Sequence, residues 1–358
     1  MEIILILSAL ILSFLLVIVV VPPIIRTAKA KHLFEPFDER KVHTEIVPPL
    51  GGVAIFIGFS ISAIFATDGL AYDALKYIMA AVIIMFFMGL KDDLMILSAR
   101  KKLIIQIVTV ILLISFANIH FTNLHGVFGE HKIGNLTSFS LSLFAIIVII
   151  NAFNLIDGVD GLASGLGMLA SSVLGTWFYL SQNYPQAIMA FALVGALAGF
   201  FLYNVFGSRN KLFMGDTGSL IIGLIISVMI VSFNELNLTA PEPYRIGGAP
   251  AVSFAIIIVP LIDTLRVMAI RIAQRRSPFS PDKNHIHHRL LSLLGSHLKV
   301  TLTILAGNVV LIAIALGLNH WQLNVNLQFI TVFLVGLGFS AIPSYVLRTK
   351  RAKKAYSA

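Results

Sequence analysis

Residues 133–161 read IGNLTSFSLSLFAIIVIINAFNLIDGVDG. The first 24 of them, 133–156, carry no charge, and about 20 apolar residues in a helix suffice to cross a bilayer. The stretch then closes on Asn154, Asp157 and Asp160, which are expensive side chains at membrane depth. This stretch therefore predicts a transmembrane helix with polar chemistry at its end.

Uncharged runs of this kind recur along the whole chain. Single runs cover 3–25, 46–67 and 103–129, double runs with a polar break cover 161–208 and 300–347, and shorter ones lie near 77–90, 217–233 and 246–272. Hydrophobic residues make up 58% of the 358 positions and charged ones 12%, against about a quarter charged in soluble domains. We predict an all-α integral membrane protein: one polytopic bundle, 1–358, of about 11 transmembrane helices.

The basic residues predict how the protein is oriented. If the connections alternate sides, 23 of the 26 Lys and Arg residues fall on one side, leaving Lys76, Lys132 and Arg245 on the other. An excess of Lys and Arg marks the cytoplasmic side. The basic tail 348–358 is then cytoplasmic, and 120–140 is external and could form a small hairpin. The net charge of +9 is explained by orientation and anionic lipid, so nucleic-acid binding is disfavoured.

Acidic side chains gather in three places on that cytoplasmic side. Asp92 and Asp93 follow the predicted third helix, the 154–160 set ends the fifth, and Asp216 opens the eighth. These places are separated by even numbers of crossings, so they share a face in either orientation. Carboxylates there need water, a cation or a partner. Cytoplasmic active-site loops are therefore expected to bring five carboxylates and an amide together.

Residue spacing suggests distinct roles within this set. Asn154, Asp157 and Asp160 are three residues apart, so they would stack along one face if the helix continued through them. Adjacent Asp92 and Asp93 point about 100° apart on a helix and should play different parts.

Asp216 lies between two glycines at a predicted helix start, where anions are favoured. A carboxylate at such a place suggests a divalent cation bridging it to a phosphate. Oxygen ligands in a chain without cysteine favour Mg²⁺, with Mn²⁺ as the alternative. Two simpler readings stay open: Asp216 as a helix cap, and Asp92 with Asp93 as solvated groups or partners of Lys91.

The longest cytoplasmic loop supplies cations and imidazoles, namely Arg275, Arg276, Lys283, His285, His287, His288 and Arg289. Such groups opposite acids favour a ligand with several phosphate oxygens. A zinc site and a solvated basic loop stay open, although the histidine spacing differs from the helical i, i+4 pair. Asp263 is expected to form an intramembrane ion pair with Arg266.

Taken in order, these motifs resemble the polyprenyl-phosphate N-acetylhexosamine-1-phosphate transferases over about residues 40–289. The matching stretches are RKVH at 40–43, PLGG at 49–52, LKDD at 90–93 with Lys102 and Gln106, 154–161, Tyr203-Asn204, 213–220 and HIHHR at 285–289. The HIHH form is similar to the branch using UDP-GlcNAc-like donors, and differs from the branch that transfers phospho-MurNAc-pentapeptide in peptidoglycan synthesis.

The resemblance implies a role for each matching residue. It implies that Asn154 and Asp216 hold Mg²⁺. It implies a phosphate and uridine site lined by Lys41, Lys102, Asp157, Asp160 and Asn204, and a sugar site covered by His285, His287, His288 and Arg289. Asp92 and Asp93 are expected to be catalytic, one orienting the acceptor or taking its residual proton and the other holding a lysine.

The implied reaction moves a HexNAc-1-phosphate, first of all GlcNAc-1-phosphate, from a UDP-sugar to undecaprenyl phosphate. Its products are undecaprenyl-diphosphate-HexNAc and UMP, and it is the first membrane step of cell-envelope polysaccharides such as lipopolysaccharide or teichoic acid. The expected location is the bacterial plasma (inner) membrane, in contact with membrane lipid and with a homodimer left open. An ion-coupled transporter is the alternative function. The acids argue against it, because they lie at one face of the membrane rather than at the midplane.

Overall fold

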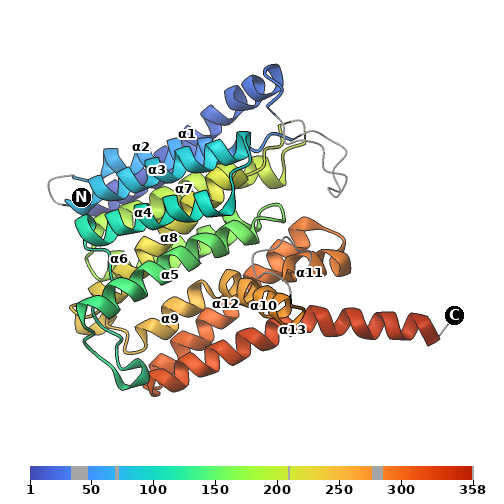
Figure 1. Ribbon diagram of the computed structural model, residues 1–358. Coiled ribbons are helices and arrows are strands. Elements are labelled where there is room, and N and C mark those ends of the chain that lie inside the picture. Colours follow the sequence, from blue (N-terminus) through green and yellow to red (C-terminus); the bar gives the residue numbers. More distant parts are fainter. Residues whose placement is uncertain (34–46, 69–71, 209, 276–284, 357–358) are drawn as a thin grey trace.

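The computed structural model describes residues 1–33, 47–68, 72–208, 210–275 and 285–356, and this part of the chain is almost entirely helical (Figure 1). Its α-helices are α1 (Glu2–Ala30), α2 (Gly51–Ala66), α3 (Ala74–Leu94), α4 (Ala99–Ala117), α5 (Asn135–Ile156), α6 (Leu162–Leu180), α7 (Tyr184–Val205), α8 (Gly215–Asn237), α9 (Ala249–Ile256), α10 (Ile258–Ala273), α11 (Ile286–Leu294), α12 (His297–His320) and α13 (Val325–Tyr356). Two short 3₁₀ helices, Val127–Gly129 and Glu242–Tyr244, lie in connections. The predicted all-α fold is confirmed.

Helix α8 lies at the centre of the bundle. Every residue from Thr217 to Asn234 is buried, and α8 packs against α2, α3, α5 and α6. A helix that is apolar on all sides needs such surroundings, because it has no polar face for water. The start of α8, where Asp216 lies, is thus held by several neighbours.

Helices α1 and α13 lie at the two edges of the bundle (Figure 1). On α1, Ile4, Leu7, Ile11 and Leu15 are exposed, and they recur every three or four residues along one face. An exposed apolar stripe of this length suits lipid. Seven helices in the described part of the chain are long and apolar enough to cross a membrane, and the bent pair α9 and α10 raises the number to eight. The chain is therefore membrane-integral.

The predicted span near 246–272 is broken in two. Helices α9 and α10 meet at a bend of 75°, and a break inside a membrane exposes backbone carbonyls. Asn308 on α12 donates hydrogen bonds to two carbonyls at this break: its Nδ2 lies 3.2 Å from Ala255 O and 3.3 Å from Ile256 O. Beyond the break, α10 carries Asp263 to the histidines at the start of α11.

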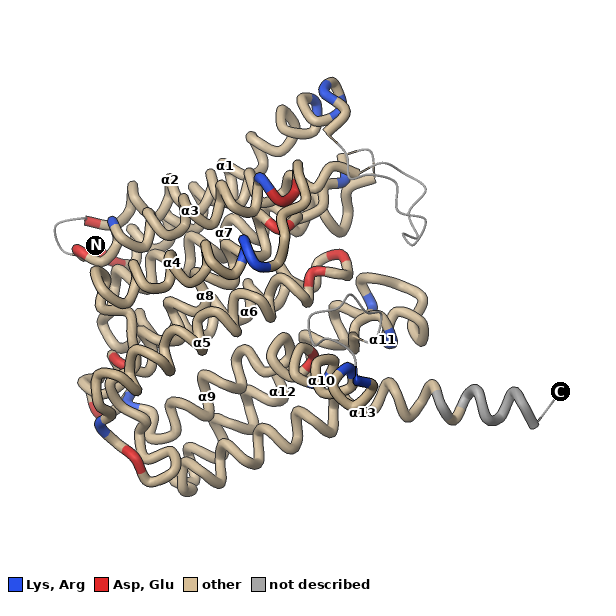
Figure 2. The backbone as a smooth tube through the Cα atoms, viewed as in Figure 1, with Lys and Arg blue, Asp and Glu red and all other residues tan. Residues whose placement is uncertain are grey.

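Charged residues gather towards the ends of the helices, and few lie in the middle of the bundle (Figure 2). At one end, the connection between α4 and α5 forms the expected hairpin, with Leu124 N donating to His131 O at 2.8 Å and Ile133 N donating to Thr122 O at 3.0 Å. The opposite end carries the acidic residues of the candidate site.

Candidate active site

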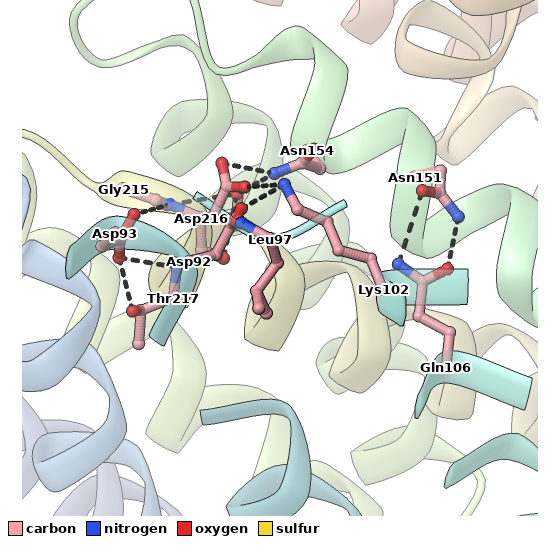
Figure 3. Close-up of polar contacts among 11 residues, drawn as sticks. Asp92, Asp93, Leu97, Lys102, Gln106, Asn151, Asn154, Gly215, Asp216 and Thr217 are labelled. Carbon is pink, nitrogen blue, oxygen red and sulfur yellow. Dashed lines mark hydrogen bonds and ion pairs between the residues drawn. The ribbon is translucent and has the colours of Figure 1, made fainter. Parts of the chain in front are cut away.

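Asp93, at the end of α3, caps the start of α8 (Figure 3). Its Oδ1 accepts a hydrogen bond of 2.6 Å from the Asp216 amide, and its Oδ2 accepts bonds of 3.0 and 2.5 Å from the Thr217 amide and hydroxyl. A carboxylate suits the partial positive charge of a helix N-terminus. The capping role therefore belongs to Asp93, and the side chain of Asp216 is left for other contacts.

The close approach of Asp93 requires glycine at position 215. Gly215 has φ +72°, and a Cβ there would lie 2.6 Å from Asp93 Oδ2 and 2.3 Å from Pro49 O. Glycine adopts positive φ without steric cost and leaves room for both oxygens. The tight turn before Asp216 and its cap thus depend on a single residue type.

Asp92 points away from Asp93, as the helix geometry predicts, and lies beside Lys102 of α4. Lys102 Nζ forms ion pairs with Asp92 and with Asp216, whose Oδ2 is 2.7 Å away. The other Asp92 oxygen accepts a 2.7 Å hydrogen bond from the Leu97 amide. Two carboxylates therefore share one lysine.

Asn154 joins this group from the last turn of α5. Its Nδ2 lies 3.0 Å from both Asp216 Oδ1 and Ser219 Oγ. One turn earlier, Asn151 Nδ2 donates to Gln106 Oε1 at 2.7 Å, which ties α5 to α4. We call Asp92, Asp93, Lys102, Asn154 and Asp216 the Asp216 cluster.

The predicted stack of Asn154, Asp157 and Asp160 on one helix face is wrong. Helix α5 ends at Ile156, before the two aspartates, and a short loop carries them. Burial, together with the charges of Asp216, Asp93 and Asp160, raises the pKa of Asp157 to about 8. Asp157 therefore lies near the Asp216 cluster but does not extend a ladder from Asn154.

Asp160 belongs to a second group at the same end of the bundle. Its Oδ2 lies 2.7 Å from Lys211 Nζ and 3.1 Å from His297 Nδ1, and its carbonyl accepts a 2.9 Å bond from Thr301. Burial alone would raise the pKa of Asp160, but the contacts with His297 and Lys211 hold it below its usual value. We call Asp160, Lys211, His297 and Thr301 the Asp160 cluster.

Sequence reasoning gave no role to Lys211 or His297. Lys211 was visible as a cation in the connection before Asp216, whereas nothing in the sequence links His297 to Asp160, 137 positions away. Asn204 acts nearby as a tie between loops: its Oδ1 accepts a 2.6 Å bond from Gly161 N, and its Nδ2 donates to Leu212 O at 2.9 Å.

The histidines lie at the start of α11 and contact Asp263 of α10. Asp263 Oδ2 is 3.1 Å from His285 Nδ1 and 3.2 Å from His287 Nδ1. The ion pair expected between Asp263 and Arg266 is therefore replaced by contacts with imidazoles, and Arg266 instead donates to Ser344 at 3.0 Å. Each of the three groups offers one ligand atom within 4.8 Å of the others, so the zinc alternative stays open at this place.

The neighbouring residues of this loop have other contacts. His288 packs against His287, with ring centroids 4.4 Å apart, and Arg289 donates a hydrogen bond to Ser344 on α13. Lys41, Arg276 and Lys283, which the sequence singled out, lie outside the described residues.

The Asp216 cluster and Asp157 offer the ligands that a hard divalent cation prefers. Carboxylate and amide oxygens are typical of Mg²⁺ and Mn²⁺ sites. Burial is the main cause of the raised pKa of Asp157, and the neighbouring charges of Asp216, Asp93 and Asp160 raise it further, so negative charge is concentrated around this place. The residues present therefore fit a divalent cation, with Asn154 and Asp216 as the predicted ligands.

Comparison with known proteins assigns this architecture to a family. Residues 75–234, from α3 to α8, match glycosyl transferase family 4. The chain is 31% identical over 270 residues to the undecaprenyl-phosphate alpha-N-acetylglucosaminyl 1-phosphate transferase of Escherichia coli strain K12, covering 74% of this chain and 71% of that protein. The chain belongs to glycosyl transferase family 4.

A second relative, from another bacterium, gives a similar result. The decaprenyl-phosphate N-acetylglucosaminephosphotransferase of Mycolicibacterium smegmatis is 32% identical over 288 residues, covering 74% of this chain and 70% of that protein. The stretch that matches glycosyl transferase family 4 contains all five members of the Asp216 cluster. The family resemblance drawn from the motifs is confirmed.

Proposed function

We propose that this protein transfers GlcNAc-1-phosphate from UDP-GlcNAc to undecaprenyl phosphate and releases UMP. The observation that carries the proposal is the Asp216 cluster, in which α3, α4, α5 and α8 bring carboxylates, an amide and a lysine to one end of a membrane bundle. Such a place is reached by a lipid phosphate from the bilayer and by a nucleotide sugar from water. The names of the relatives support a polyprenyl phosphate acceptor and the transfer of an N-acetylglucosamine phosphate.

The proposed cofactor is Mg²⁺, with Mn²⁺ as the alternative, held by the carboxylate of Asp216 and the side-chain oxygen of Asn154. A bound divalent cation supplies neutralisation of the diphosphate charge. Asp93 keeps Asp216 in place by capping α8, and Lys102 holds the oxygens of Asp92 and Asp216. These contacts fix the geometry before the substrates bind.

The proposed chemistry is a single displacement. An oxygen of the lipid phosphate attacks the β-phosphorus of UDP-GlcNAc, the bond from that phosphorus to the bridging oxygen breaks, and UMP leaves with the electron pair. A phosphate monoester has a second pKa of about 6, so at pH 7 it is largely dianionic and needs no strong base. Asp92 orients this acceptor or takes its residual proton, and Lys102 relieves the repulsion between the anions.

The roles of the other predicted residues follow from their places. Asp157, beside the Asp216 cluster, is proposed to contact the phosphate and uridine site, and His285, His287, His288 and Arg289 to cover the sugar. Asp160 and Asn204 are bonded to neighbouring loops, so we propose that they shape the site rather than touch the donor.

The proposed topology has eleven crossings of a bacterial plasma membrane, counting α9 and α10 as one, with the active site and the tail after Leu347 in the cytoplasm. Single cysteines at the exposed positions Glu130 and Ser98 of this cysteine-free chain test it. An impermeant thiol reagent on intact spheroplasts should label position 130 and not 98. The reverse pattern contradicts the proposed orientation. A homodimer remains a prediction.

The test of function is release of UMP by purified protein. UMP should form from UDP-GlcNAc when undecaprenyl phosphate and Mg²⁺ are both present, and not when either is left out. UDP-GalNAc and UDP-glucose in place of UDP-GlcNAc define the sugar preference. Absence of UMP, with cation flux in proteoliposomes, would favour the ion-coupled transporter instead.

A further inference from the structure

Asp263, His285 and His287 form a buried group outside the Asp216 cluster. Their side chains are 1%, 7% and 1% exposed. A carboxylate so deeply buried needs hydrogen-bond donors, because it loses the water that stabilises its charge. The donors come from the start of α11, so α10 and α11 are fastened together at this point.

The contacts of Asp263 show which nitrogen of each imidazole carries a proton facing the carboxylate. An ionised carboxylate only accepts hydrogen bonds, so Nδ1 of His285 and of His287 must both donate to Oδ2, at 3.1 and 3.2 Å. In a neutral imidazole the proton on Nδ1 leaves Nε2 as an acceptor. The hydrogen-bond network therefore places a proton on Nδ1 of each ring, and Nε2 is the nitrogen left for other partners.

The second oxygen of Asp263 fixes the backbone that carries these rings. Its Oδ1 accepts a 2.7 Å hydrogen bond from the amide of Ile286, the first residue of α11. One carboxylate thus holds the helix start and both ring orientations.

The ring of His287 faces the loop that carries Asp157 and Asp160. A Cβ added to Gly158 would lie 2.6 Å from His287 Nε2 and 3.1 Å from Cδ2, so the ring packs directly on the backbone of that loop. Any larger residue at position 158 would displace the ring. Asp263 is connected in this way, through His287, to the edge of the candidate active site.

We propose that Asp263 is a positioning residue that holds the His287 proton on Nδ1 and directs Nε2 to the 157–160 loop, where Nε2 accepts a hydrogen bond from a hydroxyl or amide of the donor's sugar. This inference rests on the proposed transferase function. Asp263 itself touches no substrate, and its effect is exerted on the binding of the UDP-sugar alone.

The test compares KM for the two substrates in Asp263→Asn. An asparagine has a single side-chain acceptor oxygen, so it cannot serve both Nδ1 donors and the Ile286 amide. KM for UDP-GlcNAc should rise about tenfold or more, with KM for undecaprenyl phosphate unchanged. His287→Gln should show the same rise, and the double variant should be no worse than the poorer single variant.

Asn308→Ala is the matched control, since it weakens the same broken span without touching the histidines. It should lower Tm and leave both KM values within twofold of wild type. If Asp263→Asn behaves like this control, or if its effect multiplies with that of His287→Gln, the positioning role is overturned.

Nitrogen-15 NMR of the histidine rings separates this inference from the proposed function. The resonance lost in His287→Gln identifies His287, which should carry its proton on Nδ1 in wild type and lose that preference in Asp263→Asn. If the wild-type protein transfers no sugar phosphate, this measurement still decides whether Asp263 orients His287. A proton on Nε2, or stoichiometric zinc that is lost in Asp263→Asn, contradicts the proposal.

Discussion

The Asp216 cluster and the Asp160 cluster lie at the same end of the bundle but differ in the balance of negative and positive charge. In the Asp160 cluster one carboxylate contacts a lysine and an imidazole. In the Asp216 cluster Asp92 and Asp216 share Lys102, and burial together with the negative charge of this cluster raises the pKa of nearby Asp157 to about 8. In the first group one carboxylate has two basic partners, whereas in the second three carboxylates, Asp92, Asp93 and Asp216, lie around a single lysine.

The two clusters also differ in how far their central carboxylates are exposed to solvent. The side chain of Asp160 is 11% exposed and that of Asp216 is 32% exposed. A buried carboxylate that is paired with basic side chains from other segments holds loops together. An accessible carboxylate is suited to bind a cation and, through that cation, a phosphate. Similar residue types thus serve stability in one place and chemistry in the other.

The largest effect is expected for Asp216→Ala, which removes the central carboxylate of the unbalanced cluster. Turnover should fall at least about 100-fold, because charge neutralisation at the diphosphate is lost. Tm should stay close to wild type, since the cap on α8 comes from Asp93. The exposed Asp73→Asn is the control and should leave turnover unchanged. Near-normal turnover in Asp216→Ala would return Asp216 to a structural role.

Gly215→Ala should give the next largest loss. A Cβ at this position would meet Asp93 Oδ2, so the cap and the direction of Asp216 should change, and turnover should fall about tenfold or more. Gly295→Ala is a close control, because Gly295 also has a positive φ, +64°, but open space around its Cβ. Equal loss of turnover in both variants would show that backbone strain alone is responsible.

Asp160→Asn should affect stability more than turnover. It removes the charge that Lys211 and His297 contact, and a partly buried pair of this kind contributes about 1–3 kcal/mol to the free energy of unfolding. We expect a lower Tm than for Asp216→Ala, with kcat per folded molecule within about tenfold of wild type. Thermal unfolding and kinetics on the same preparations compare the two clusters directly. A stable, inactive Asp160→Asn would erase the distinction between them.

The smallest effect concerns Asp157 and pH. Its folded pKa of about 8 exceeds the unfolded value of about 3.9, so its contribution to stability is full below pH 4 and is lost as pH rises through 8. In chelator, Tm should therefore increase from pH 9 to pH 6. Asp157→Asn should flatten this dependence, and Mg²⁺ should reduce it in wild type. A parallel pH dependence in the variant would assign the effect to other groups.

The positions of the helices were easier to predict from the sequence than their ends. Long uncharged runs identify membrane helices, and the even number of crossings between acidic loops correctly predicts that Asp92, Asn154 and Asp216 share one face. The end of α5 at Ile156 was not visible, because Asn154, Asp157 and Asp160 have the spacing of a continuing helix. Tertiary context, here the loop packed against His287, overrides that pattern.

Contacts between distant segments were the hardest to predict. The cap from Asp93 to the start of α8 spans 123 positions and depends on the turn at Gly215, and α10, which carries Asp263 to His287, follows a bend of 75° after α9. Neither turn nor bend has a unique sequence signal. The sequence pattern identified the acidic residues of the site. Only the packing of the helix ends showed which aspartate holds loops together and which one is accessible to a ligand.

The most direct test of the proposed reaction follows two labels from one donor. UDP-GlcNAc carrying ³²P in the β-phosphate and tritium in the sugar is incubated with purified protein, undecaprenyl phosphate and Mg²⁺, and the lipid is extracted. We expect both labels to enter the lipid in a 1:1 ratio with one UMP released per transfer, and neither label to enter with Asp216→Ala. Tritium in the lipid without ³²P, or ³²P retained on the protein at a catalytic rate, would contradict a single displacement at the β-phosphorus.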